Sequence, residues 1–469
     1  MDMQSAGYFV FLGTLVILHR QLAASWRPWM LLAASLLFYA QSSLLNLGII
    51  AIACAINYAA VSFLSGASDG RARAGVFAAI VAIDLALLIA FKYCLGPLHY
   101  RLGVSSSLAV ALTMPLGISY LTFQMIAANT DALRRDWALG GTRRDFYLFG
   151  FFFPQITSGP IPRAERLLPQ LSSGDAPTSE DLADGCRLIA YGLFKKLVVS
   201  NRLNDYVSEI FAPPSEALNL HYSTVPTAIG CVFNLLNLYA DFSSYVDIAI
   251  GSARLFGIRL DPNFDRPLLS TSVTEIWRRW HMSLSFWLRD YLFMPLLIRM
   301  GDTGNLGVVA ALLVTFGICG IWHGASWTYL VFGVIQGIAM SAELTTRRWR
   351  SKRLKKLPVR PIKMAGWAYA MSVFVLSEIF FRASSLDDAS TIFERLIHVT
   401  RIGDAQDLFA HKGPFDFTMY FAAIALWFGI SRAFRRAASV STPAFVLICA
   451  LLVLFLGHLG NGRFIYAGF

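Results

Sequence analysis

The chain has 469 residues, of which 56% are apolar and 15% are charged, and its mean hydropathy is +0.55. This composition excludes an ordinary soluble domain, in which about 25% of the residues are charged. The formal net charge is +11, but much of the excess lies in one loop at 347–363, between two apolar stretches, which argues against nucleic acid as a partner.

Long apolar stretches recur along the whole chain and predict an all-α, polytopic integral membrane protein. A spanning helix needs roughly 20 mostly apolar residues, and roughly a dozen stretches approach that length. We expect residues 1–469 to form a single integral domain. The candidate spans lie near 6–20, 28–43, 44–64, 76–93, 106–128, 187–200, 223–240, 244–258, 283–299, 306–321, 326–343, 364–382, 416–432 and 443–460.

The basic loops predict one orientation in the membrane. Lys and Arg gather at 19–27, 65–75, 134–145 and 347–363, and such loops remain on the cytoplasmic side. The cluster at 347–363 can also favour anionic lipid.

The stretch at 145–171 is interrupted by prolines and glycine, so it predicts a re-entrant or interfacial segment rather than a simple span. The six cysteines are scattered, and no Cys/His spacing typical of a metal site is present, so we expect neither disulfides nor a metal.

A polar stripe interrupts the apolar stretch at 233–251. Asn234, Asn237, Asp241 and Ser244 share one face of a helix with 3.6 residues per turn. Two interpretations are open: hydrogen bonds that hold neighbouring helices together, or one wall of a water-filled tunnel that binds substrate.

The segment WRRWHMSLSFWLRD (277–290) concentrates charge and aromatic rings. An amphipathic helix at the membrane interface would place Trp277, Trp280 and Trp287 in an aromatic belt and let Arg278 and Arg279 reach the head groups. That interpretation does not explain His281, which is either a structural residue or a catalytic one.

A second histidine lies in the apolar segment GICGIWHGASWTYLVFGVIQG (317–337). His323 follows Trp322 and lies well inside the predicted membrane region. Imidazole titrates near neutrality and serves as a general base; a hydrogen-bonded packing role is the alternative. The sequence has no Walker A motif and no HExxH motif. This favours direct transfer, in which a base deprotonates a hydroxyl that attacks an activated acyl group.

Four motifs occur in order between about 115 and 340, namely FFPQITSGPI, DFSSYVDIAIG, NFDRPLLSTSVTEIWRRWHMSLSFWLRDY and GIWHGASW. Together they resemble the bacterial polysaccharide branch of the membrane-bound O-acyltransferases, which includes alginate O-acetylases and teichoic-acid D-alanyl transfer proteins. The resemblance implies a ring of tilted helices around a central tunnel. It also implies that His323 is the catalytic base and His281 the second family histidine.

The resemblance further implies transfer of an acyl group, with acetyl favoured, from a cytoplasmic thioester to a hydroxyl outside the membrane. The donor would be acetyl-CoA or an acyl carrier protein, and the acceptor an extracytoplasmic polysaccharide or an accessory acyltransferase. No bound cofactor and no covalent Ser or Cys nucleophile are implied, and the location is the inner (cytoplasmic) membrane. Candidates to hold the donor's phosphates are Arg278, Arg279, Lys195 and Lys196.

Three alternatives remain open. PLLIRMGDTGN stands where alginate acetylases show a PLGGNR-like turn, so the acceptor is not fixed, and D-alanyl transfer from a carrier-protein thioester to a cell-envelope polymer is the nearest alternative. A small-molecule membrane transporter would use the polar stripe as its binding site. A scaffold for polysaccharide export would not depend on either histidine.

Overall fold

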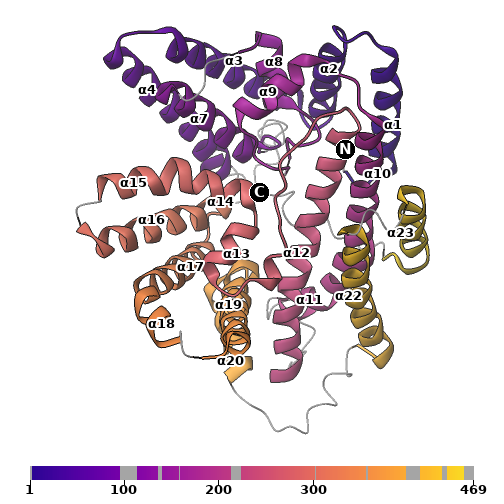
Figure 1. Cartoon of the computed structure of the whole chain (residues 1–469), viewed down its shortest axis with the longest axis vertical. Helices are drawn as coiled ribbons and strands as arrows, with labels where there is room; N and C mark the ends of the chain where they lie inside the picture. Colours follow the sequence, from indigo (N-terminus) through magenta and orange to yellow (C-terminus); the bar gives the residue numbers. More distant parts are fainter. Residues whose placement is uncertain are drawn as a thin grey trace. The chain divides into compact units, whose positions relative to one another are not determined.

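The computed structural model describes residues 3–95, 114–135, 140–157, 159–212, 223–300, 303–354, 357–397, 412–435 and 441–458. Every regular element within these ranges is a helix (Figure 1), which confirms the predicted all-α class. The chain divides into two compact units. Unit 1 comprises Met1–Ile189, Tyr245–Pro262 and Phe469, and unit 2 comprises Ala190–Ser244 and Asn263–Gly468. The single domain expected over 1–469 stays a prediction.

The described residues include six helices that are long and apolar enough to cross a membrane. Together with the family assignment below, they make the chain a multi-pass membrane protein; the ring around a tunnel stays a prediction. The six spans are Leu44–Gly66, Gly70–Cys94, Asn305–His323, Trp327–Thr345, Val359–Arg382 and Pro414–Arg435.

Two groups of predicted spans differ from the structure. The segments predicted at 223–240 and 244–258 form one helix, α12 (Thr224–Arg254), because the polar residues between them are buried and paired rather than placed in a loop. The span predicted at 283–299 is divided among α14 (Met282–Leu288), a π-helix η4 (Arg289–Phe293) and α15 (Met294–Arg299). The first part of the predicted span 106–128 lies outside the described residues.

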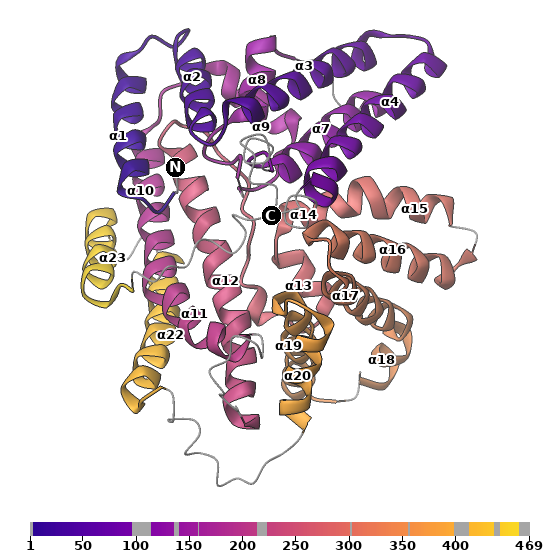
Figure 2. The ribbon, with the colours of Figure 1, turned by 180° about the vertical axis from the view of Figure 1, so that it is seen from behind.

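Unit 1 contains α3, α4 and α7, which lie side by side (Figures 1 and 2). The predicted re-entrant stretch forms two short helices, α8 and α9. The described residues between them, 152–157 and 159–163, have irregular backbone that begins with the fully buried Phe152 and Phe153. The helices of unit 1 are α1 (Ala6–Gln21), α2 (Arg27–Ala40), α3 (Leu44–Gly66), α4 (Gly70–Ile89), η1 (Ala90–Leu95), α7 (Ile118–Arg134), α8 (Arg143–Phe151), α9 (Ala164–Ser173) and most of α10 (Ser179–Phe194).

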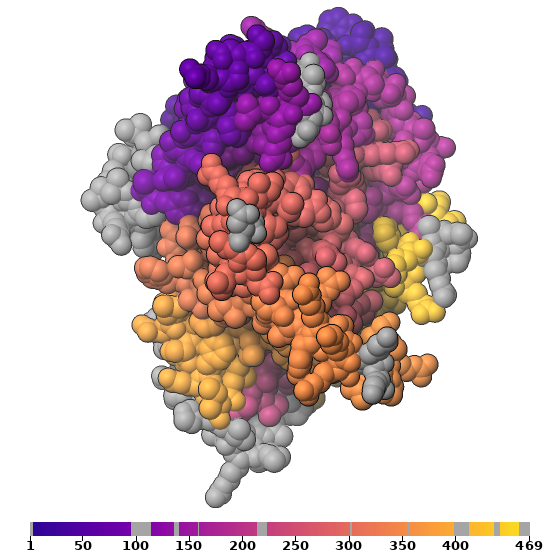
Figure 3. Space-filling model, turned by 60° about the vertical axis from the view of Figure 1, so that its left-hand side comes forward, coloured from indigo at the N-terminus to yellow at the C-terminus, as the bar shows by residue number. Residues whose placement is uncertain are grey.

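Unit 2 is built around α16 and α17, which form an antiparallel hairpin, and α17 also packs against α13 and α19. Ser272 and Ser326 begin α13 and α17, since each side chain accepts a backbone N–H of the first turn. Figure 3 shows the face on which the salmon and orange helices α15–α19 reach the surface. The remaining helices of unit 2 are η2 (Lys195–Ser200), α11 (Asn201–Ile210), η3 (Pro267–Leu269), α13 (Val273–Arg279), α16 (Asn305–His323), α17 (Trp327–Thr345), α18 (Arg347–Leu354), α19 (Val359–Arg382), α20 (Leu386–Ile397), α22 (Pro414–Arg435) and α23 (Thr442–Leu456).

Candidate active site

Glycines bring the two helices of the α16–α17 hairpin into close contact beside His323. A Cβ added to Gly320 would lie 2.2 Å from the carbonyl oxygen of Tyr329, and one added to Gly333 would lie 2.1 Å from that of Phe316. Both obstacles are backbone atoms, so only glycine allows this approach. The absence of a side chain at Gly324 leaves no open space beside His323. The Tyr329 ring fills it, since a Cβ added to Gly324 would lie 2.5 Å from that ring.

His323 is the last residue of α16 and is 3% exposed. Its ring has edge contacts with Trp322, at 4.7 Å between centroids, and with Phe381 of α19, at 4.9 Å. The Cys319 sulfur lies 4.0 Å from Nε2, one helical turn before. The imidazole therefore lies at the carboxyl end of α16, where the helix carries a partial negative charge.

The predicted helix over 277–290 breaks at its centre. Trp280 adopts an extended backbone and ends α13, and His281 has φ +42°, in the left-handed region that non-glycine residues rarely occupy. Strain of this kind persists only where surrounding contacts enforce it, and it gathers at functional sites. Here the enforcing residue is Asn263, whose backbone carbonyl accepts the Met282 N–H at 2.9 Å.

The Asn263 side chain also orients the His281 ring. Its Oδ1 accepts the backbone N–H and the hydroxyl of Ser283, both at 2.9 Å, and lies 3.3 Å from Nδ1 of His281. A carbonyl oxygen only accepts, so this contact assigns the proton to Nδ1 and the lone pair to Nε2. His281 is 1% exposed, and burial lowers the pKa of its imidazole to about 3. The ring is therefore neutral at physiological pH.

A continuous aromatic cluster links the two histidines within unit 2. Six rings lie between His323 and His281, and each neighbouring pair of centroids along the path is 4.8–6.5 Å apart. Such edge and offset contacts favour a fixed geometry. The six intervening rings are Phe332, Trp277, Phe374, Trp280, Phe264 and Phe242.

The tryptophans of this segment lie in the protein interior, so the interpretation as an interfacial belt is wrong. Trp280 is 3% exposed, and Trp277 donates its indole N–H to Oε1 of Gln336 at 3.0 Å. The two arginines differ. Arg279 forms an ion pair with Glu275 at 2.7 Å, whereas Arg278 is exposed and lines a pocket considered below.

The polar stripe of α12 is buried, and its side chains bond to neighbouring helices. The amide of Asn234 donates to the carbonyl of Glu378 on α19 at 3.4 Å, and that of Asn237 to Oδ1 of Asn204 on α11 at 3.2 Å. Ser244 donates to the carbonyl of Asp241 within the helix. These contacts support the interpretation that the stripe joins helices, and a role in a tunnel wall stays a prediction.

Two lysines of η2 complete this network. Lys196 forms a fully buried ion pair with Asp241 at 2.6 Å, and Lys195 donates to the hydroxyl of Ser243 at 2.7 Å. Both ammonium groups are therefore committed to the fold rather than presented to a donor's phosphates.

Several residues around the histidines were not predicted from the sequence. Asn263 precedes His281 by 18 positions in NFDRP, and only its place within the long motif could have drawn attention to it. Tyr329 and Phe381 come from two other helices, and nothing in their local sequence indicates contact with His323.

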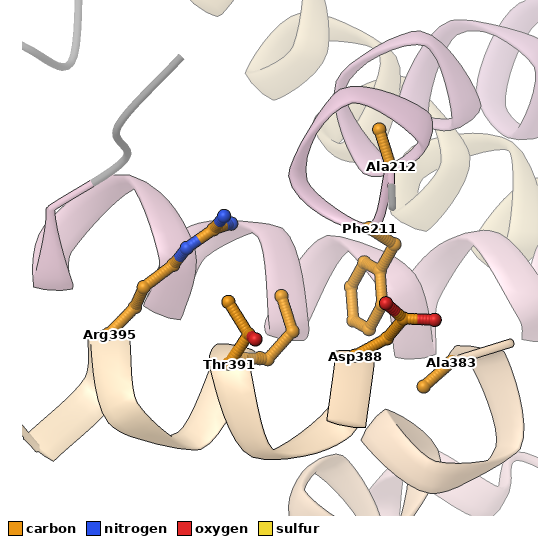
Figure 4. Close-up of a pocket in the computed structure, with 7 residues that line it drawn as sticks. Phe211, Ala212, Ala383, Asp388, Thr391 and Arg395 are labelled. Carbon is orange, nitrogen blue, oxygen red and sulfur yellow. The ribbon is translucent and has the colours of Figure 1, made fainter. Parts of the chain in front are cut away.

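Unit 2 also contains a cavity that is too small for a substrate. The cavity between the end of α11 and α20 holds about 10 Å³, roughly the space of one water molecule, and Arg395 closes one side of it by donating to the carbonyl of Ile210 (Figure 4). Among the described residues no three His, Cys, Asp or Glu side chains gather as metal ligands. The absence of a metal from the site stays a prediction.

Comparison with known proteins agrees with these motifs. Residues 143–386 match the family described as MBOAT, membrane-bound O-acyltransferase. A protein of Azotobacter vinelandii named "Probable alginate O-acetylase AlgI" is 32% identical over 391 residues, which is 81% of this chain and 74% of that protein. The Helicobacter pylori "Peptidoglycan O-acetyltransferase" is 29% identical, over 79% of this chain and 73% of that protein. The Streptococcus thermophilus "Teichoic acid D-alanyltransferase" is 31% identical, over 55% of this chain and 65% of that protein.

The family match covers more than half of the chain and contains both histidine motifs, and the acetylase relatives align along most of it. The chain therefore belongs to the membrane-bound O-acyltransferase family and is an O-acyltransferase.

Proposed function

We propose that this enzyme transfers an acetyl group from a cytoplasmic thioester to a hydroxyl of a polysaccharide outside the inner (cytoplasmic) membrane, directly or through an accessory acyltransferase. The similarity to the alginate and peptidoglycan acetylases extends over 81% and 79% of the chain, against 55% for the D-alanyltransferase. The longer similarity favours acetyl as the acyl group and a polysaccharide as the acceptor.

The observation that carries the proposal is the buried position of His323 at the far end of a spanning hairpin. The basic loop at 347–363 follows α17 and favours the cytoplasmic side for the carboxyl end of α17 and for the start of α16. His323 is 18 residues from that start, a rise of up to about 27 Å. The imidazole is thus remote from cytoplasmic water, which would hydrolyse a thioester.

In the proposed reaction His323 takes the proton of the acceptor hydroxyl as its oxygen attacks the thioester carbonyl. A C–O bond forms, and the C–S bond breaks when the tetrahedral intermediate collapses. The thiolate that leaves regains the proton from the imidazolium, so the histidine returns neutral. No cofactor and no net proton transfer are required.

His281 has a different proposed role. Its ring stays neutral because it is buried, and Asn263 fixes its tautomer. A fixed, neutral imidazole can hold the donor or the developing oxyanion through a hydrogen bond without competing for the proton. Trp280 and Trp322 would lie beside the reacting groups in this proposal, with Asn234, Asn237, Asp241 and Ser244 along the tunnel.

Cys319 brings a thiol into contact with His323, but it is a poor nucleophile in this position. It is buried, and the carboxyl end of α16 disfavours the negative charge of a thiolate. The proposed transfer is therefore direct, without an acyl-enzyme.

The experiment uses purified protein in liposomes, radiolabelled acetyl-CoA on one side and alginate or peptidoglycan fragments on the other. We expect label in the polymer on the opposite side. A transporter would move a substrate chemically unchanged, and a scaffold would leave the thioester intact. If label were transferred only from a D-alanyl carrier-protein thioester, the acyl group would be D-alanyl rather than acetyl. That is the alternative favoured by the similarity to the D-alanyltransferase.

A further inference from the structure

A second, larger pocket lies among α13, α14, α15, α16 and α17 of unit 2. Its volume is about 710 Å³, within the roughly 300–1,000 Å³ typical of ligand pockets. Most of its wall is apolar, and Val308, Leu312 and Phe316 follow α16 for about 12 Å. The long wall fits a hydrocarbon chain.

Two guanidinium groups make the pocket amphiphilic. Arg289 is engaged, since it forms an ion pair with Asp290 at 2.6 Å and lies over the Phe286 ring. Arg278 is exposed and has no hydrogen-bond or ion-pair partner among the described residues. An arginine without a partner beside an apolar wall is complementary to a phosphate that carries a hydrocarbon chain.

The position of the pocket in the hairpin indicates which amphiphile reaches it. Its lining includes Val308 near the start of α16 and Leu344 near the end of α17. The basic loop at 347–363 follows directly from that end of α17. Neighbouring side chains of the same helices face outward, with Leu306 78% and Ile338 55% exposed. In a membrane protein such apolar faces contact lipid, and basic pockets between spanning helices on the cytoplasmic side bind anionic lipid head groups.

We propose that this pocket binds an anionic phospholipid of the cytoplasmic leaflet, with its phosphate on Arg278 and one acyl chain along α16. Coenzyme A also carries phosphates, but its pantetheine arm is rich in polar amides. Apart from its arginines, the wall offers only three hydroxyl side chains, Thr274, Ser285 and Thr315, and the rest of it is apolar. The phosphate predicted for Arg278 is therefore assigned to a lipid rather than to the acyl donor.

The test is lipid binding, measured by native mass spectrometry of the full chain in detergent with added phosphatidylglycerol or phosphatidylcholine. We expect preferential retention of phosphatidylglycerol by the wild type. Arg278→Gln should weaken that binding about tenfold, which is the worth of one charge-assisted hydrogen bond. The matched control Arg432→Gln, which removes the same charge from an exposed position of α22 outside the pocket, should change it less than about twofold, because exposed charges remote from the bound head group are screened.

The apolar wall has its own pair of variants. Met340→Trp should fill the pocket and reduce lipid retention, whereas Leu306→Trp places the same ring on an outward face and should not. Because lipid binding needs no acyl transfer, these results do not depend on the proposed function.

Three results would overturn the proposal. The first is equal retention of phosphatidylglycerol by wild type and Arg278→Gln. The second is equal loss in the two arginine variants, which would indicate general surface charge. The third is displacement of the bound lipid by millimolar coenzyme A, which would assign the pocket to the acyl donor.

Discussion

At the scale of single residues, Asn263 fixes the orientation of His281. Asn263→Ala removes the acceptor for Nδ1 and for Ser283 together. Losing a buried hydrogen bond of this kind costs about 1–3 kcal/mol, so we expect kcat to fall about 10- to 100-fold with KM for the thioester changed less.

Ser283→Ala is the matched control, since it removes one donor to the same oxygen and keeps the contact with His281. It should retain most of the activity in the same liposome assay. Equal losses in both variants would mean that Asn263 supports the loop rather than the ring.

The buried imidazole of His281 also predicts how stability depends on pH. Its pKa is about 3 when folded, against about 6.5 when unfolded, so the unfolded chain binds the extra proton first. Burial of the neutral ring therefore has no pH-dependent cost to the free energy of unfolding above about pH 6.5. As the pH falls below that value the free energy of unfolding decreases, by about 2 kcal/mol at pH 5.

Thermal denaturation of wild type and His281→Asn between pH 7.5 and pH 5 measures this effect. The Tm of the wild type should fall further than the Tm of the variant between pH 7.5 and pH 5. Parallel curves would contradict the assignment of a low pKa to His281.

At the scale of elements, the close approach of α16 and α17 determines where His323 lies. Gly320→Ala sets a methyl group against the Tyr329 carbonyl, and overpacking of this kind costs about 1–3 kcal/mol. We expect lower thermal stability and lower activity. Gly317→Ala on the same helix, where the nearest atom is 3.8 Å from the added Cβ, should change neither.

The pairing of η2 with α12 predicts a second effect at this scale. Lys196→Met or Asp241→Leu alone leaves one buried charge without its partner, which costs about 3–5 kcal/mol. The double variant removes both charges and should recover most of the stability. If the double variant lost as much stability as the two single variants added together, the ion pair would not be the cause of the losses.

The elements also show how far the sequence predicts the fold. Apolar length alone predicts the spans at 306–321 and 326–343, because α16 and α17 are long and predominantly apolar. Apolar length wrongly predicts a break within α12, near Asp241. Whether Asp241 is solvated or paired depends on Lys196, which lies on another helix 45 residues away in the sequence. Apolar length misses the break at His281 for the same reason, since Asn263 holds the turn from outside the segment.

At the scale of the whole molecule, the motifs identify the family and both histidines, while the surroundings of those histidines need the structure. His323 could be chosen as a candidate site residue from the sequence, because a histidine is rare within an apolar span. The aromatic rings around it come from α16, α17 and α19, so no single stretch of sequence contains them. The roles of Arg278 and Arg279, adjacent in sequence, separate only when the ion pair of Arg279 with Glu275 is seen.

The central claim is that the imidazole of His323 is the base in a direct acyl transfer, and single-turnover acetyl transfer by purified His323→Ala in liposomes tests it most directly. General-base catalysis contributes about 10²–10⁴-fold, so we expect a loss of that size in correctly folded protein. Cys319→Ala, one turn earlier on the same helix, should stay within a few-fold of wild type. Wild-type transfer by His323→Ala, or complete loss in Cys319→Ala with a labelled acyl-enzyme in the parent, would contradict the account.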